Sequence, residues 1–359
     1  MKLEYKFLHK PNRYLIENLK FVLNIKPNLK INKFYVKNNI LFLDYEWDKD
    51  IIPIINKFDS PIEMDDKIIY INFNKKSKSK DNKFFNELIE KELVYKEMDG
   101  VYLYFGIVNE LYISLSNYFR KKMRALGAEE IYLPSLLNAK TLDRTNYIKN
   151  NGLLCNYVFH KDCDVVDGVL NPAACLPLYQ VLANKQKKGL FTGFSRVFRF
   201  EGNNYFEMSR LREYGIRELV YVEDENKVVD YKSTLINLLI EILNELNLSG
   251  HIEIATDMFF ENEFIAKSIY QKAFNKKYEL RLRLNQEETI AGCSINMHND
   301  FFTKQWGIKN GEKYYESLCL GFGIERWCYS ILCQFGYDKD KFPTEIKKLI
   351  EENYGWYIN

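Results

Sequence analysis

The chain has 359 residues, enough to bury a large core as one large domain or two modest ones. Its 51 Lys and Arg nearly balance its 49 Asp and Glu, so no global positive field marks it as a nucleic-acid-binding protein. No apolar run reaches the ~18 residues of a membrane span, and the N-terminus does not resemble a secretion signal. Its seven scattered cysteines therefore predict reduced thiols. We expect a cytoplasmic protein with no membrane partner.

The predicted elements begin with a small N-terminal α+β region, residues 1–84. In FYVKNNILFLDYEW and KIIYINF, β-branched and aromatic residues alternate with polar ones, as they do in strands. The Lys-rich stretch 74–83 predicts an exposed loop. Residues 85–359 are expected to form a second, larger domain.

The larger domain begins with a predicted amphipathic helix over residues 106–126. Its apolar residues recur every three to four positions, and Gly127 is placed to end it. The strand EEIYLPSLL follows at once, and a strongly apolar helix is predicted over residues 233–247. HIEIATDMFF and YELRLRLN then predict strands. The last third of the chain is thus expected to be antiparallel sheet with helices on one face.

A predicted hairpin in residues 196–224 gathers arginines, acids and an aromatic ring. Strand 197–200 is followed by a Gly-Asn-Asn turn and by strand 211–222. Because side chains alternate along a strand, one face carries Arg199, Glu201, Arg210, Arg212, Tyr214, Ile216 and Glu218. One interpretation is a solvated surface of ion pairs, each worth about 0–1 kcal/mol. The other is a nucleotide site, in which cations bind phosphates, the ring stacks on the base and an acid accepts its amine.

The segment GFGIER, residues 321–326, favours the nucleotide interpretation, because its glycines permit close backbone approach and its arginine can hold a terminal phosphate. Together with ALGAEEIYLP and FRFE…RLREY, it resembles the three signature motifs of class II aminoacyl-tRNA synthetases. The resemblance covers residues 95–335 and implies an antiparallel sheet flanked by helices. Cys319 departs from it, since the third motif usually begins with glycine, and we expect this change to affect local packing more than the arginine.

The resemblance implies an ATP site. Arg199 would bind the α-phosphate and the substrate carboxylate, Glu201 the adenine amine, and Tyr214 would stack on adenine. Arg210 and Arg326 would hold the γ-phosphate from two sides, and Arg199 and Arg326 are the expected catalytic residues. Such a site works by positioning and charge neutralisation while a carboxylate attacks ATP in line.

Magnesium ions are expected on the phosphates of the bound ATP. Glu288 is the candidate residue for holding one of them.

Two cysteines lie in segments whose resemblance to known families implies a metal site. The sequences around Cys175 and Cys293 resemble those of methanogen-type seryl-tRNA synthetases and of their shortened relatives, the amino acid:[carrier protein] ligases. In that family two cysteines and a glutamate hold Zn²⁺, and the open position takes the substrate amino group. Glu218 is the expected acid because it shares a strand face with Tyr214. Glu213 is the alternative, since a bulge would reverse the alternation.

Asn296 and His298 are expected in the substrate pocket. His298 is not expected to bind the metal, because a fourth protein ligand would close the site. The remaining cysteines are expected to be buried small hydrophobes: Cys155, Cys163, Cys319, Cys328 and Cys333.

The acceptor is inferred from the N-terminal region and from two local resemblances. Bacterial seryl-tRNA synthetases carry an N-terminal helical arm with heptads, whereas residues 1–84 show strand alternation. YIKNNGLLCNYVF and CSINMHNDFFTKQWGI resemble the carrier-protein ligases more than the synthetases. The resemblance implies activation of a small amino acid such as glycine, alanine or serine, and transfer to the phosphopantetheine thiol of a small acidic carrier protein, with no tRNA partner.

Two alternatives stay open: a seryl-type tRNA synthetase, and a non-enzymatic relative that has a regulatory or binding role. The first motif also implies a homodimer with an isologous interface.

Overall fold

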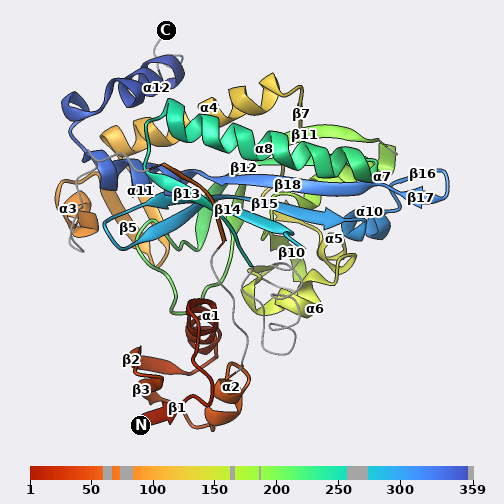
Figure 1. Cartoon of the computed structure of the whole chain (residues 1–359). Helices are drawn as coiled ribbons and strands as arrows, with labels where there is room; N and C mark the ends of the chain where they lie inside the picture. Colours follow the sequence, from red (N-terminus) through yellow and green to blue (C-terminus); the bar gives the residue numbers. More distant parts are fainter. Residues whose placement is uncertain (60–66, 73–83, 162–165, 186, 257–273, 355–359) are drawn as a thin grey trace.

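A computed structural model of the chain describes residues 1–59, 67–72, 84–161, 166–185, 187–256 and 274–354 (Figure 1). The predicted loop 74–83 and Cys163 lie outside these residues. An eight-stranded sheet forms the centre of the molecule. Neighbouring strands in it are antiparallel, apart from the parallel pair at one edge, β11 with β7. The strand order is β4 (Lys67–Asn72), β13 (Gly250–Ile254), β14 (Lys277–Arg283), β15 (Thr289–Asn299), β18 (Glu316–Gly323), β12 (Glu213–Glu223), β11 (Gly189–Phe198) and β7 (Glu129–Glu130).

One face of the sheet is covered by long helices: α4 (Gly106–Ala125), α8 (Glu225–Glu245) and α11 (Ile324–Phe335) (Figure 1). The apolar stripe of α4 packs on the sheet, where the ring of Phe119 stacks on Phe322 with centroids 4.2 Å apart. Gly127 follows α4 with φ of +86°, a conformation that ends a helix and favours glycine. The predicted helix and the antiparallel sheet flanked by helices are therefore confirmed.

The other face of the sheet carries a second hydrophobic core, so the expectation of helices on one face only is wrong. Val197, Val220 and Cys319 reach this core from the sheet, and Tyr179 and Trp306 pack on them from two helices. The elements over this face are α7 (Leu176–Lys185), α10 (Phe301–Trp306), the small sheet of β8 (Leu136–Leu137), β10 (Val166–Leu170) and β9 (Tyr157–Phe159), and the short helices α5 (Ala139–Asp143), α6 (Tyr147–Asn151) and η1 (Gly152–Leu154).

The N-terminal unit has its own core, which runs from Phe7 to Phe58 and also takes in Leu154 of the larger domain. It comprises the sheet β1 (Lys2–Lys6), β3 (Ile40–Glu46) and β2 (Lys30–Lys37) with helices α1 (Arg13–Asn24) and α2 (Ile52–Asn56). In Figure 1, α1 lies on the side of this unit that faces the larger domain.

The expected domain boundary after residue 84 needs a correction. Strand β4 pairs with β13 and extends the large sheet, so Lys67–Asn72 belong to the larger domain. Alternation in KIIYINF predicted a strand but could not say which sheet it joins.

Smaller elements complete the described part of the chain. They are α3 (Phe84–Glu90), the hairpin β5 (Val94–Met98) and β6 (Val101–Tyr104), the hairpin β16 (Lys309–Asn310) and β17 (Lys313–Tyr314), η2 (Lys339–Lys341) and α12 (Thr344–Tyr354). Among the described residues, no helix has both the length and the apolar character needed to cross a membrane.

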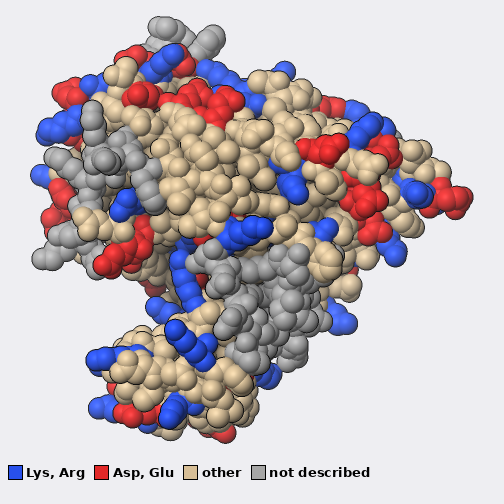
Figure 2. All heavy atoms as spheres, in the orientation of Figure 1, with Lys and Arg blue, Asp and Glu red and all other residues tan. Residues whose placement is uncertain are grey.

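Charge is unevenly divided between the two units. Residues 1–58 hold 11 Lys and Arg against 6 Asp and Glu, which leaves 40 against 43 for the rest of the chain. Figure 2 shows Lys and Arg side chains spread over the N-terminal unit. The nearly neutral total therefore hides a basic N-terminal unit.

Candidate active site

A cavity of about 1790 Å³ lies between the sheet, α1 and the α6–η1 segment. It is larger than the ~300–1,000 Å³ of an ordinary small-molecule site. All six residues expected to contact ATP or its magnesium line this cavity: Arg199, Glu201, Arg210, Tyr214, Glu288 and Arg326. The sequence hypothesis thus selected side chains that the fold brings together.

The predicted hairpin is confirmed as β11 and β12. Val197 stands opposite Tyr214, and beyond the strands the Arg199 N–H donates to Arg212 O at 2.9 Å. The Arg199 guanidinium lies over the Tyr214 ring, 6.0 Å from its centroid, and its Nε donates to Pro172 O at 2.9 Å. Both contacts hold Arg199 at the cavity wall.

Glu201 and Arg210 face each other across the loop that joins these strands. Arg210 Nη1 donates to Glu201 Oε2 at 3.0 Å, and Glu201 is buried. The Arg210 guanidinium also lies over the ring of Phe21, 5.4 Å from its centroid. Phe21 belongs to α1, so the N-terminal unit contributes to the wall of this cavity.

Arg326 lies in the first turn of α11, and two backbone carbonyls orient its guanidinium. Its Nε donates to Ser209 O at 2.9 Å and its Nη1 to Ala291 O at 3.0 Å. Burial lowers the pKa of Arg326, yet an arginine keeps its charge near neutral pH. Glu288 differs, because it lies exposed at the rim and accepts from Asn285 Nδ2 at 2.7 Å.

Sequence reasoning missed Glu325, which fastens α11 to the hairpin. Its buried carboxylate accepts from Gly215 N at 2.9 and 3.0 Å and from Arg196 Nη1 at 3.1 Å. Burial raises the pKa of Glu325 to about 7, and Arg196 and Gly215 oppose that rise. Arg196 also pairs with Glu213 at 2.9 Å, so Glu213 faces this network. The structure therefore gives no support to Glu213 as the alternative metal ligand.

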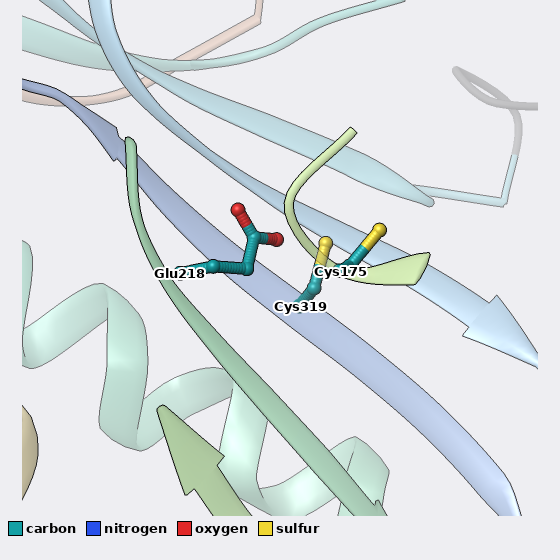
Figure 3. A group of neighbouring side chains, drawn as sticks. All are labelled: Cys175, Glu218 and Cys319. Atoms are coloured by element: carbon teal, nitrogen blue, oxygen red, sulfur yellow. The ribbon is translucent and has the colours of Figure 1, made fainter. Parts of the chain in front are cut away.

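A second group of side chains, Cys175, Glu218 and Cys319, lies on the same sheet face (Figure 3). One potential ligand atom from each lies within 4.8 Å of the others. Cys175 directly precedes α7, Glu218 is on β12, and Cys319 is on the neighbouring strand β18. Glu218 stands opposite Gly321, where an added Cβ would lie 2.7 Å from Glu218 Oε2. This glycine therefore leaves the room that the carboxylate occupies.

The donor chemistry of the group suits Zn²⁺, which binds thiolates and carboxylates and leaves a position open when the protein supplies three ligands. Burial raises the pKa of Glu218 to about 7. The hydrogen bond with Cys175, burial and the charge of Glu218 together raise the pKa of Cys319. A cation among these three side chains would offset the cost of ionising them.

Cys293 does not belong to this group, so its prediction as a metal ligand is wrong. On β15 it stands opposite Phe322 of β18, and both side chains lie in the core beneath the long helices. Cys319 lies in the core on the opposite face. The second thiol of the group therefore comes from Cys319. Its departure from the third motif was expected to affect local packing, whereas it places a sulfur beside Cys175 and Glu218.

Asn296 and His298 lie beside Cys319. His298 Nε2 is 3.1 Å from Cys319 Sγ, and Asn296 Nδ2 is 3.6 Å from the same atom. Neither residue lines the large cavity. Tyr147 does line it. Burial raises the pKa of its hydroxyl; Arg199 opposes this rise, and Tyr214 and Cys175 add to it. Tyr147 thus lies close to residues of both groups.

No family model matches the chain. It is 27% identical over 285 residues to amino acid–[acyl-carrier-protein] ligase 1 of Bradyrhizobium diazoefficiens, covering 70% of this chain and 85% of that protein. Ligase 2 of the same organism is 27% identical over 284 residues, which cover 70% and 83%. The chain is thus similar in sequence to the amino acid–[acyl-carrier-protein] ligases. The type-2 serine–tRNA ligase of Methanothermobacter thermautotrophicus is 26% identical over 192 residues, which cover 51% of this chain but 37% of that enzyme.

Solved structures identify the fold of the chain. The M. kandleri seryl-tRNA synthetase, in complex with A. aeolicus tRNASec, matches 99% of this chain and 78% of its own, with a TM-score of 0.71 and 16% identity. The cytoplasmic serine-tRNA ligase of Naegleria fowleri, in complex with AMP, matches 82% and 73%, with a TM-score of 0.65 and 14% identity. The chain therefore has the class II seryl-tRNA synthetase fold, as its motifs predicted.

Proposed function

We propose that the chain is an amino acid:[carrier protein] ligase, which activates a small amino acid with ATP and transfers it to a phosphopantetheine thiol. The observation that carries this proposal is that the sheet face bearing Tyr214, which lines the ATP cavity, also bears the Cys175–Glu218–Cys319 group. The sequence relationship to ligases named for acyl-carrier proteins supports it.

The ATP half of the site neutralises charge and positions the phosphates. Arg199 would bind the α-phosphate and the substrate carboxylate, and Arg210 and Arg326 would bracket the γ-phosphate. Tyr214 would stack on adenine while Glu201 accepts its amine. The substrate carboxylate oxygen then attacks the α-phosphorus, the bond to pyrophosphate breaks, and an aminoacyl adenylate forms. Mg²⁺ on the phosphates would share in neutralising their charge, and Glu288 at the rim would hold one such ion.

The amino acid half of the site would hold Zn²⁺ between Cys175, Glu218 and Cys319. Bound there, the ion would take the deprotonated amino group of the substrate and reject a blocked amine. His298 and Asn296, which contact Cys319, would fix the orientation of that sulfur. The side chain we propose is a small one of the glycine, alanine or serine type, as the resemblance to the carrier-protein ligases implies.

In the transfer half-reaction the acceptor thiol loses its proton and its sulfur attacks the carbonyl carbon of the adenylate. AMP leaves with the electron pair of the broken carbonyl–oxygen bond, and a thioester remains on the carrier protein. The cytoplasmic location expected from the sequence stays a prediction.

The test is amino-acid-dependent ATP–pyrophosphate exchange across the twenty amino acids, followed by transfer of the preferred one. Acceptors are phosphopantetheinylated carrier proteins, the same carriers without the prosthetic group, and total tRNA. We expect exchange with a small amino acid and transfer to the phosphopantetheinylated carriers alone. Exchange followed by transfer only to tRNA would replace the proposal with its alternative.

A seryl-type tRNA synthetase is the second candidate, and two observations favour it. The likeness to the tRNA-bound M. kandleri synthetase covers 99% of the chain, so it extends over the N-terminal unit, and that unit is basic. Against it, this chain matches 85% of the carrier-protein ligase but 37% of the M. thermautotrophicus enzyme. Affinity for tRNA that falls steeply with salt would support this candidate. A non-enzymatic role is disfavoured by the intact set of ATP residues.

A further inference from the structure

Helix α1 of the N-terminal unit is hydrogen-bonded to the loop that joins β11 to β12. Asn24, the last residue of the helix, donates from Nδ2 to Asn204 Oδ1 at 2.9 Å, and its backbone oxygen accepts from Asn203 N at 3.2 Å. Asn204 Nδ2 in turn donates to Phe21 O at 3.3 Å. These three hydrogen bonds join segments about 180 positions apart in the chain.

The contact is so close that it requires glycine at position 202. Gly202 has φ of +59°, and a Cβ there would lie 2.3 Å from the backbone oxygen of Asn24. Any side chain at this position would push the loop away from α1.

This loop carries two of the six residues expected to contact ATP or its magnesium. Glu201 precedes Gly202, and Arg210 pairs with Glu201 while lying over the Phe21 ring. Phe21 is 5% exposed, so its ring is fixed in the N-terminal core. An aromatic face fixed in this way restricts where the guanidinium can lie.

The larger domain holds the same segment from the other side. Leu154 O accepts from Phe200 N at 2.8 Å, while the Leu154 side chain packs into the core of the N-terminal unit. The start of the loop is thus pinned where the two units meet. Movement of the N-terminal unit would displace Glu201 and Arg210 together.

We infer that the N-terminal unit is a built-in positioning element of the ATP site, with Phe21 and Asn24 as the positioning residues that hold Glu201 and Arg210 in place. The inference rests on the proposed function for its effect on ATP. Its structural part, the ordering of residues 201–206 by α1, stands independently. It gives the N-terminal unit a role in amino acid activation that does not depend on which acceptor follows.

The test uses the full-length chain and pairs each variant with a control. Gly202→Ala adds a Cβ against Asn24, whereas Gly311→Ala adds one at φ of +60° with nothing within 4 Å. The pair shares the backbone strain and differs in the clash. Phe21→Leu removes the ring under Arg210, and Phe21→Tyr keeps it. Hydrogen exchange of the backbone amides is measured for every variant, together with the Kd for ATP and, in pyrophosphate exchange, the KM for ATP and kcat.

We expect Gly202→Ala and Phe21→Leu to speed hydrogen exchange of the backbone amides in residues 201–206. The Kd and KM for ATP should rise about tenfold, the size expected when one or two ordering contacts are lost. Gly311→Ala and Phe21→Tyr should stay within twofold of the wild type. Protected amides in β3 will confirm that the N-terminal unit remains folded.

The outcomes separate this inference from the proposed function. If hydrogen exchange in residues 201–206 is unchanged in both Gly202→Ala and Phe21→Leu, the inference is overturned, whatever the activity. Faster hydrogen exchange in this loop with an unchanged Kd for ATP would show that the N-terminal unit orders the loop without affecting ATP binding, which would overturn the inference for the ATP site. A wild type that binds ATP but activates no amino acid would overturn the proposed function, and the comparison of Kd values would still decide the inference.

Discussion

Nε2 of His298 lies 3.1 Å from Sγ of Cys319, and the His298 ring packs against Phe302 with centroids 4.6 Å apart. The ring is therefore held in place by packing on one side while it faces the sulfur on the other. We therefore expect His298 to orient the Cys319 sulfur without binding the metal itself.

His298→Ala should weaken Zn²⁺ binding about 10- to 100-fold without removing the site, the usual effect of losing such a partner. Competition with a chelator of known affinity measures the change. The amino acid KM should rise together with the Zn²⁺ Kd, while the Kd for ATP should not change. Loss of ATP binding in this variant would contradict the separation of the two halves of the site.

Arg199→Ala should raise the activation free energy of pyrophosphate exchange by roughly 3 kcal/mol or more, because the positive charge expected to face the phosphates is lost. The change is measured as a fall in kcat/KM. Arg212→Ala is the matched control. Arg212 is on the same hairpin but bonds to Asn156 Oδ1 at 3.1 and 3.3 Å and does not line the cavity. Near-normal exchange in Arg199→Ala, in protein with an unchanged Tm, would remove Arg199 from the catalytic role.

Zinc affinity should fall as the pH drops through about 7. Burial raises the pKa of Glu218 to about 7, so below that pH a proton competes with the metal for the carboxylate. Calorimetric titrations at pH 6 and pH 8 should also show proton release on binding, since the pKa of Cys319 is raised as well. Equal affinity at the two pH values would exclude this set of ligands.

The metal-free protein should show the opposite dependence in its stability. Because the folded pKa of Glu218 lies above the unfolded value, its stabilising contribution is complete below pH ~4.5 and is lost as pH rises through about 7. Glu218→Gln should lack this component of the free energy of unfolding. Urea unfolding of both proteins in a chelator, at several pH values, measures the difference.

The expected homodimer has its own test. Helix α4 and β7 match the first motif, and Glu130 of β7 pairs with Arg120 of α4 at 2.7 Å and with Arg217 of β12 at 3.1 Å. We expect light scattering at micromolar concentration to return twice the mass of the chain. A monomer under these conditions would contradict the prediction.

That the proposed ATP residues line one cavity could be predicted from the sequence, because they lie in short motifs of characteristic spacing. Alternation along one hairpin predicts a shared face for Arg199, Glu201 and Tyr214. It predicts the same face for Arg212, which instead bonds to Asn156 and does not line the cavity. The contribution of α1 could not be predicted, because Asn24 and Asn204 meet through the packing of two units and no local pattern records that contact.

The metal group was partly predictable for a related reason. Alternation correctly separated Glu218 from Glu213. Alternation along β15 also argues against Cys293. Asn296 and His298, which are expected in the pocket, occupy even positions, so Cys293 at an odd position lies on the opposite face of the sheet. The register shift between β14 and β15 lies just before Cys293, so its face could not be derived from Glu288 upstream.

We propose that Cys175, Glu218 and Cys319 hold a metal ion beside the ATP cavity, and that this ion binds the amino acid while ATP activates it. The most direct measurement is zinc content, with amino-acid-dependent pyrophosphate exchange, in Cys319→Ser and Cys293→Ser. We predict that Cys319→Ser loses stoichiometric zinc and exchange while its Kd for ATP is unchanged, and that Cys293→Ser, if folded, keeps both. Full zinc and exchange in Cys319→Ser, or their specific loss in folded Cys293→Ser, would contradict the account.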